Sequence, residues 1–156
     1  MITQFPDPIL SQKTQDIKKI DKATRDLIAR LWEELEKEPI GIGLAAPQIG
    51  EPYSVAVIHF EPSKEQLKKN QEIKPIPKTV LINPKIVWKS KDIAVEKEGC
   101  LSIPDIEVEV PRYKKVHVEY LDENGKKQKI KARGLLARLL QHEIDHLYGR
   151  KIIDYQ

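Results

Sequence analysis

The chain has 156 residues, which is the length of one ordinary domain and enough to bury a hydrophobic core. Apolar residues make up 40% of it and charged residues 33%, which is typical of a folded globular protein and not of a disordered one. The net charge of +3 is densest over residues 64–78 and predicts a solvated, lysine-rich surface. No basic motif is interleaved with aromatic residues, so we expect no sequence-specific nucleic-acid binding, while a weak attraction to RNA stays open.

The remaining global features concern the compartment. The single cysteine, Cys100, excludes an intrachain disulfide and favours a reducing environment inside a cell. Residues 1–6 lack the basic start and apolar run of a secretory signal, and no apolar run is long enough to cross a membrane. We therefore expect a cytoplasmic protein with no membrane partner, and an organellar location stays open.

The first predicted element is a helix over residues 21–37. Asp21 can cap its N-terminus, and Pro39 and Gly41 end it. One apolar stripe at helical spacing runs along it, formed by Ala23, Leu27, Ile28, Leu31, Trp32 and Leu35. A helix with a single apolar stripe packs that stripe on a core and exposes the rest.

Strand-like runs follow. Apolar and alternating patterns predict strands over residues 55–60, 79–82, 86–88, 106–110, 116–120 and 130–132. The polar, proline-containing stretch 61–78 predicts an exposed loop, because it has no apolar periodicity. The turn Asp122-Glu123-Asn124-Gly125 joins the last two strands into a hairpin.

The last predicted element is a largely apolar helix over residues 134–148 that ends at Gly149. The expected fold is therefore α+β, with mostly antiparallel strands packed around this C-terminal helix and the N-terminal helix outside. No internal repeat and no Gly/Ser linker divides the chain, so residues 1–156 are expected to form a single catalytic domain.

The C-terminal helix carries the clearest chemical signal. The run His142-Glu143-Ile144-Asp145-His146 fits HExxH, in which two histidines four residues apart point the same way and can bind one metal ion. Glu143 is then placed to take a proton from a water molecule at the metal. The competing interpretation is a pair of core histidines with ordinary hydrogen bonds, but a buried histidine is costly unless it is paired or coordinated.

Two histidines leave a catalytic metal one protein ligand short. After His146 only Asp154 could donate, and it lies about two helical turns after that histidine and past a glycine stop, so the third ligand is expected upstream. His59 and His117 sit in strand patterns that favour structural or surface roles, and several acids are further candidates. Cys100 is favoured because a thiolate is a strong ligand and the metal itself drives deprotonation.

Three segments now match one known family. Gly41–Gln48 (GIGLAAPQ), Glu98–Ser102 (EGCLS) and Gln141–Leu147 (QHEIDHL) occur in the order and at the separations found in peptide deformylases. The chain resembles this family over essentially its whole length. The resemblance implies a metal-dependent hydrolase that removes the N-formyl group from newly made proteins.

The resemblance also implies the metal site. The ligands would be Cys100, His142 and His146, with water in the fourth position and Glu143 as the general base and acid. Family members typically hold Fe(II), while zinc, nickel or cobalt can occupy the same site. Ligand softness and geometry alone would point to zinc.

Further roles follow only from the family pattern. The oxyanion would be stabilised by the side-chain amide of Gln48 and the backbone N–H of Leu101. Gly41 and Gly43 would let the backbone lie beside an extended peptide. Ile42 and Leu135 match residues that line the methionine pocket, and both could equally be ordinary core.

Position 107 departs from the family pattern, and two other functions compete with deformylation. Glu107 stands where some family members have an arginine that holds the peptide backbone. The expected partners are N-formyl-methionyl nascent peptides, and a transient contact with the ribosome is compatible with the resemblance. An endoprotease on the same helix, and a purely structural Cys-His-His site, are the competing functions. The first lacks a downstream ligand and the second leaves Glu143 without a role.

Overall fold

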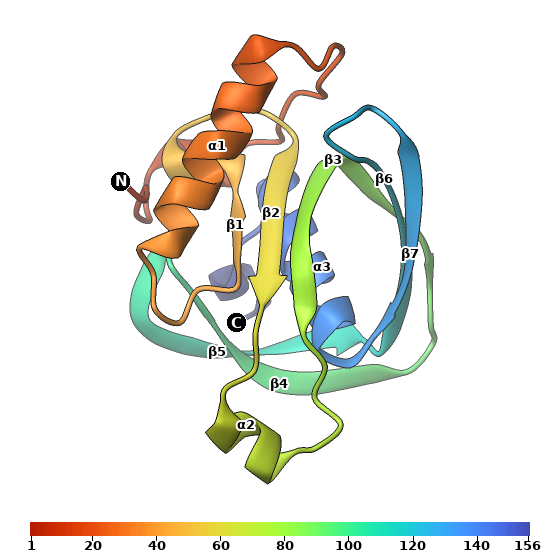
Figure 1. Ribbon diagram of the computed structural model, residues 1–156. Helices are drawn as coiled ribbons and strands as arrows, with labels where there is room; N and C mark the ends of the chain where they lie inside the picture. Colours follow the sequence, from red (N-terminus) through yellow and green to blue (C-terminus); the bar gives the residue numbers. More distant parts are fainter.

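Two antiparallel β-sheets frame the protein in the computed structural model, which describes residues 1–156 (Figure 1). The larger sheet has the strand order β1-β2-β3-β6-β7. Its strands are β1 (Gly43–Ala45), β2 (Val55–Phe60), β3 (Ile76–Lys89), β6 (Lys115–Leu121) and β7 (Lys127–Arg133). The smaller sheet pairs β4 (Ile93–Cys100) with β5 (Ile103–Tyr113). All strand pairs are antiparallel, so the predicted α+β class is confirmed.

The C-terminal helix α3 (Gly134–Leu147) lies inside this frame, as Figure 1 shows. Its buried residues share one hydrophobic cluster with the inner faces of the large sheet, made up of Ala137, Leu139, Leu140, Ile144, Ile58, Leu81, Val116, Val118 and Ala132. The helix also contacts β5 of the small sheet. Because α3 touches both sheets, residues from either one can reach its side chains.

The N-terminal helix α1 (Lys22–Glu36) covers the outer side of the large sheet near β1 and β2 (Figure 1). Asp21 caps it by accepting a hydrogen bond from the Thr24 N–H, as the sequence predicts. The predicted stripe packs on a core that includes Leu44, Val55 and Val57. Ala23 is the exception, because it is exposed at the start of the helix.

Three parts of the middle region differ from the predictions. The stretch 61–78 is not only loop: it contains the exposed helix α2 (Lys64–Lys69), which a Ser63–Gln66 capping box starts. The two strands predicted over residues 79–88 are one strand, β3, that continues through Pro84. Strand β4 was not predicted, because most of its side chains are exposed and its run Glu96-Lys97-Glu98 is charged.

Short 3₁₀ helices complete the chain at Pro8–Ser11, Ala46–Ile49 and Ile152–Tyr155. The second follows β1 directly, and the third packs against β5. None of the helices combines the length and the apolar character that crossing a membrane requires.

Candidate metal centre and active site

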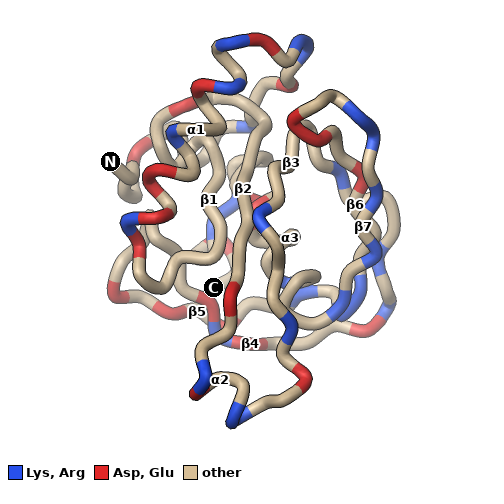
Figure 2. Tube along the Cα trace, in the orientation of Figure 1, with Lys and Arg blue, Asp and Glu red and all other residues tan.

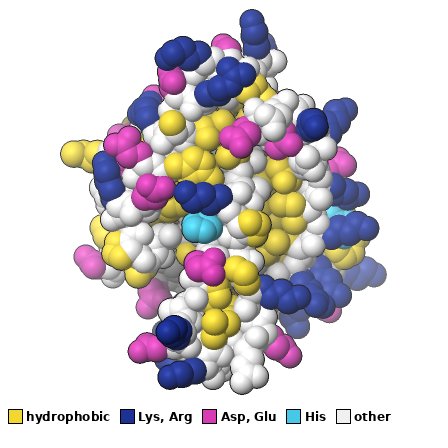
Figure 3. Space-filling view, viewed as in Figure 1, with side chains coloured by type: hydrophobic (Ala, Val, Ile, Leu, Met, Phe, Trp, Pro, Cys, Tyr) yellow, Lys and Arg dark blue, Asp and Glu magenta, His cyan; other side chains and the backbone are white.

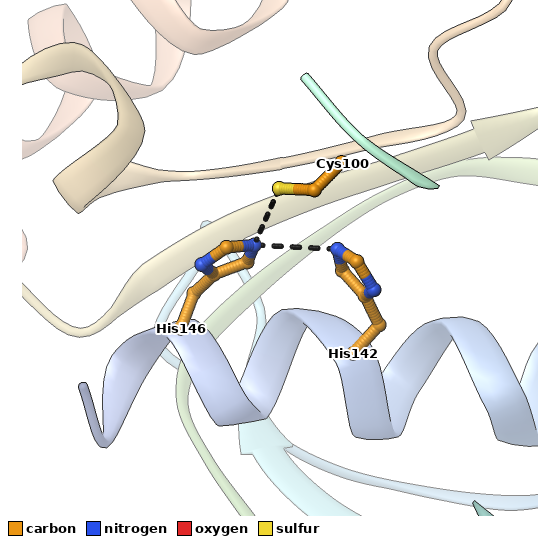
Figure 4. A group of neighbouring side chains, drawn as sticks. All are labelled: Cys100, His142 and His146. Carbon is orange, nitrogen blue, oxygen red and sulfur yellow. Dashed lines mark hydrogen bonds between the residues drawn. The ribbon is translucent and has the colours of Figure 1, made fainter. Parts of the chain in front are cut away.

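Three potential metal ligands meet between the inner helix and the end of the small sheet. His142 and His146 lie one turn apart on α3, and Cys100 is the last residue of β4 (Figure 4). The His146 Nε2 atom lies 3.2 Å from the His142 Nε2 atom and 3.4 Å from the Cys100 Sγ atom. All three ligand atoms lie within 4.8 Å of one another. The structure thus brings together the three residues that the sequence analysis singled out.

These separations fit a tetrahedral metal site. Metal–nitrogen bonds of about 2.05 Å and a metal–sulfur bond of about 2.3 Å place two tetrahedral nitrogens about 3.3 Å apart, and a nitrogen and a sulfur about 3.5 Å apart. The observed distances of 3.2 and 3.4 Å agree with this geometry. Burial alone would lower the pKa of His142, but hydrogen bonds to Cys100 and Glu98 raise it to about 10. Burial is the largest cause that lowers the pKa of His146 well below its ordinary value.

Glu98 orients the His142 ring through the Nδ1 atom, which is the ring nitrogen that does not face the other ligands. Its carboxylate lies 2.9 Å from the His142 Nδ1 atom and accepts two hydrogen bonds from Arg112, at 2.9 and 2.8 Å. An Nδ1–H that donates to a carboxylate leaves the Nε2 lone pair free for a metal. Burial raises the pKa of Glu98, but the hydrogen bonds from Arg112 and His142 outweigh it and hold this pKa well below its usual range.

The sequence analysis missed the hydrogen-bond network around Glu98. Arg138 also donates to Glu98, and Arg112 continues the network to Asp145 on α3. Tyr155, near the C-terminus, donates to Asp145 at 2.6 Å. The one available signal was the EGC run, in which Glu98 precedes the cysteine by two residues and so shares its face of the strand. The distant arginines gave no local signal.

Glu143 lies beside the ligands and is almost completely buried, with 2% of its surface exposed. Its Oε1 atom has no hydrogen-bond partner in the protein. Burial raises the pKa of Glu143 to about 7, against the opposing effect of His142. A carboxyl group with this pKa can both accept and return a proton near neutral pH.

Two hydrogen-bond donors, the Gln48 side-chain amide and the Leu101 backbone N–H, lie near Cys100. The Gln48 side chain is buried, and its Oε1 atom accepts a hydrogen bond from the Ala45 N–H at 2.9 Å. Its Nε2 group therefore points to Cys100 Sγ, at 3.6 Å, and to Ser102 Oγ, at 3.2 Å. The backbone N–H of Leu101, next to Cys100, donates to no protein group. The Leu101 N–H is free to bind a negatively charged oxygen near the ligands, and the Gln48 amide can do so in place of its contact with Ser102 or Cys100.

Gly41 and Gly43 lie close to the site, because a Cβ atom on Gly43 would be 2.6 Å from the Glu143 Oε2 atom and one on Gly41 would be 3.1 Å from a Leu101 methyl group. Strand β1 is at the edge of the large sheet, and the Ile42 carbonyl accepts from the His59 N–H at 2.9 Å. Because peptide groups alternate along a strand, those of Gly43 face the open edge. Ile42 and Leu135 are both half-buried against the cluster around α3.

The other two histidines are not part of the group. His59 lies in β2, and His117 lies in β6, where its ring stacks on Trp88. Neither joins the cluster of potential ligands, which agrees with the structural or surface roles that their strand patterns favour.

Comparisons with known proteins give the family. The polypeptide deformylase family model matches residues 1–156. A peptide deformylase of Bartonella tribocorum is 44% identical over 154 residues, which cover 99% of this chain and 82% of that protein. The chain belongs to the polypeptide deformylase family.

Solved structures of family members agree in fold. A peptide deformylase from Ehrlichia chaffeensis superposes with a TM-score of 0.88 at 38% identity and covers 99% of this chain and 86% of its own. A class I type b peptide deformylase from Acinetobacter baumannii, bound to Met-Ala-Ser, superposes with a TM-score of 0.90 at 25% identity and covers 100% and 97% of the two chains.

Proposed function

We propose that this chain is a metal-dependent hydrolase that removes the N-formyl group from the N-terminal methionine of newly synthesised proteins and releases formate. The observation that carries the proposal is the buried Glu143 carboxylate beside three convergent ligand atoms of Cys100, His142 and His146. Membership of the polypeptide deformylase family over residues 1–156 supports it and supports one catalytic domain.

Cys100, His142 and His146 would hold the metal ion. A divalent ion there would polarise the formyl oxygen and lower the pKa of a water molecule. Glu143 takes the proton from the attacking water and then delivers it to the leaving amine. Its pKa of about 7, which burial raises, suits both steps.

Gln48 and Leu101 stabilise the charge that develops on the formyl oxygen. The Gln48 amide is pre-oriented because the Ala45 N–H holds its oxygen, so the Nε2 donor does not have to reorganise during the reaction. The unpaired N–H of Leu101 supplies the second donor. The Gln48 Nε2 atom lies 3.6 Å from Cys100 Sγ, and Leu101 follows Cys100 in the chain, so both donors are close to the ligands.

The peptide would add to the free edge of β1 as an extended strand. The outward peptide group of Gly43 can bond to its backbone, which is the usual way an edge strand recognises a peptide. Ile42 and Leu135 would then contact the methionine side chain. A relative from Acinetobacter baumannii has been solved with Met-Ala-Ser bound, which is compatible with a peptide of this size.

Finer assignments rest on the family resemblance. Fe(II) is proposed as the native metal, with zinc, nickel or cobalt able to replace it, because the Cys-His-His donor set accepts all four. A cytoplasmic location is supported by bacterial relatives such as that of Bartonella tribocorum. A transient contact with the ribosome fits a substrate that is still being synthesised.

The test uses anaerobically purified protein loaded with iron or nickel. Formate release from formyl-Met-Ala-Ser is expected, without cleavage of an internal peptide bond. Glu143→Ala should lower kcat by about 10²–10⁴-fold while the metal content stays unchanged. The exposed Glu109→Ala serves as the matched control and should keep full activity. No formate from the loaded wild type, or loss of metal from Glu143→Ala, would contradict the proposal.

A further inference from the structure

The outer face of strands β3, β6 and β7 carries an unusual concentration of positive charge. The register places Lys115, His117 and Glu119 of β6 opposite Arg133, Lys131 and Lys129 of β7, and it places Lys85 and Trp88 of β3 opposite Glu119 and His117. Directly paired residues share a face of the sheet. Lys127 continues the row on β7, because side chains alternate along a strand. We call this the basic face.

None of the cations on the basic face is neutralised by a salt bridge. The ion pairs of the protein involve other residues, and the six cations here, Lys85, Lys115, Lys127, Lys129, Lys131 and Arg133, are all exposed. Glu119 is the one acid among them. Figure 2 shows the blue positions gathered along β6 and β7, and Figure 3 shows dark-blue side chains along the same margin.

His117 lies next to these positive charges, and its pKa responds to them. Desolvation, followed by the charges of Lys129 and Lys131, lowers its pKa. Its imidazole lies against Trp88, with the ring centres 4.5 Å apart and the ring planes tilted by 36°. Trp88 is 46% exposed on the same face. An open aromatic surface thus lies among unpaired cations.

Protection of a sheet edge is the simplest explanation for lysines on a terminal strand. It accounts for Lys127, Lys129 and Lys131, because β7 is the last strand of its sheet. It does not account for Lys85 and Lys115, which lie on the inner strands β3 and β6, nor for an exposed tryptophan beside them. The charge therefore covers a surface and not only an edge.

We propose that the basic face is a docking surface for a single-stranded segment of RNA, bound without sequence preference. Lys127, Lys129, Lys131 and Arg133 contact the phosphates, and an unpaired base stacks on Trp88. Cations along a groove or strand together with an exposed aromatic ring are the combination that binds single-stranded nucleic acid. An acidic polypeptide would match the charges alone, whereas every nucleotide of single-stranded RNA also supplies a base that can stack on Trp88.

The commitment to RNA rests on the proposed function, since a substrate that is still being synthesised emerges next to RNA. The location of the surface is compatible with catalysis. The inner side chains of β6 and β7, such as Val118 and Ala132, pack toward α3, so the basic face lies on the opposite side of the sheet from the metal ligands. RNA bound there leaves the peptide approach along β1 open.

The test measures fluorescence anisotropy of a fluorescein-labelled single-stranded RNA of twelve nucleotides, titrated with metal-loaded protein at several KCl concentrations. We expect a Kd of about 1–100 µM near 0.15 M salt, falling as salt is lowered. The triple variant Lys127→Glu/Lys129→Glu/Lys131→Glu should weaken binding by at least about tenfold and reduce the slope of log K against log salt by roughly 2. Its formate release should match that of the wild type.

A matched control carries the same change in net charge elsewhere. Lys64, Lys68 and Lys74 are exposed and form no salt bridge, so Lys64→Glu/Lys68→Glu/Lys74→Glu tests the effect of overall charge. It should bind RNA within about threefold of the wild type, because screening limits charges beyond about 10 Å. Equal loss in both triple variants would overturn the proposal.

Two further measurements test the stacking on Trp88 and the identity of the bound molecule. Trp88→Ala should weaken RNA binding by at least about fivefold, and Trp88→Phe should restore most of it, because stacking needs an aromatic face. Ultraviolet crosslinking in cells should give an adduct that ribonuclease removes and that the Lys127/Lys129/Lys131 variant lacks. An adduct sensitive only to deoxyribonuclease, or tighter binding to anionic phospholipid vesicles than to RNA, would contradict the assignment. These readouts do not depend on deformylation, so either proposal can fail alone.

Discussion

Gly43 offers the sharpest test of how the fold holds Glu143. A Cβ atom at this position would lie 2.6 Å from the Glu143 Oε2 atom, 2.9 Å from its Cδ atom and 3.0 Å from a Leu139 methyl group. Ordinary contacts are about 3.5 Å or longer, so Gly43→Ala has to push the carboxylate aside by about 1 Å. The group that yields is the end of a flexible side chain, which limits the loss of stability to about 1 kcal/mol.

The cost should fall on catalysis instead. A misplacement of about 1 Å can lower the rate about 10²-fold, so we expect kcat/KM for formyl-Met-Ala-Ser to fall by about that factor in Gly43→Ala. Metal content and melting temperature, measured on the same sample, should change little. Gly99→Ala is the control, because its Cβ atom meets nothing closer than the Ile106 carbonyl at 3.9 Å. A Gly43→Ala enzyme within threefold of wild type would refute this account of Glu143.

Two other predictions concern the network behind the ligands. Tyr155→Phe removes the hydrogen bond to Asp145 but keeps the ring beside Arg112, and metal affinity measured by competition with a chelator should fall about tenfold; an unchanged affinity would disconnect Tyr155 from the site. The folded protein holds the pKa of Glu98 below its ordinary value of 4.5, so ionised Glu98 stabilises the fold at pH values above 4.5. This contribution to the free energy of unfolding is lost as the pH falls below 4.5 toward the pKa of the folded state. Urea unfolding of the metal-free protein between pH 6 and about pH 3 should therefore show a steeper loss of stability in wild type than in Glu98→Gln.

The elements that the sequence predicted well are those with a local pattern. Helix α3 has a periodic apolar face and a glycine stop, and it was predicted over residues 134–148 against the observed Gly134–Leu147. Cys100 was favoured over the other candidates, since the two histidines required a further ligand and a thiolate is a strong one. The family motifs then added Gln48, which no local pattern distinguishes from an ordinary loop residue.

The elements that the sequence missed depend on distant partners. Strand β4 looks like a charged, exposed segment, because nothing in Glu96-Lys97-Glu98 announces that Glu98 will be buried. Its burial depends on Arg112 and Arg138, which are 14 and 40 residues away in the chain. Helix α2 was missed because its residues are all exposed and its six residues are too short for a periodic signal.

The buried charges around Glu98 orient a metal ligand more than they stabilise the fold. Taking ions out of water carries a large desolvation cost, so a buried ion network is weak evidence for stability. Glu98 nevertheless receives hydrogen bonds from two arginines and faces the Nδ1 atom of His142. The carboxylate is thereby fixed from three directions, which fixes the plane of the imidazole and turns its Nε2 atom toward His146 (Figure 4). We therefore expect substitutions in the hydrogen-bond network around Glu98 to alter metal binding more than stability.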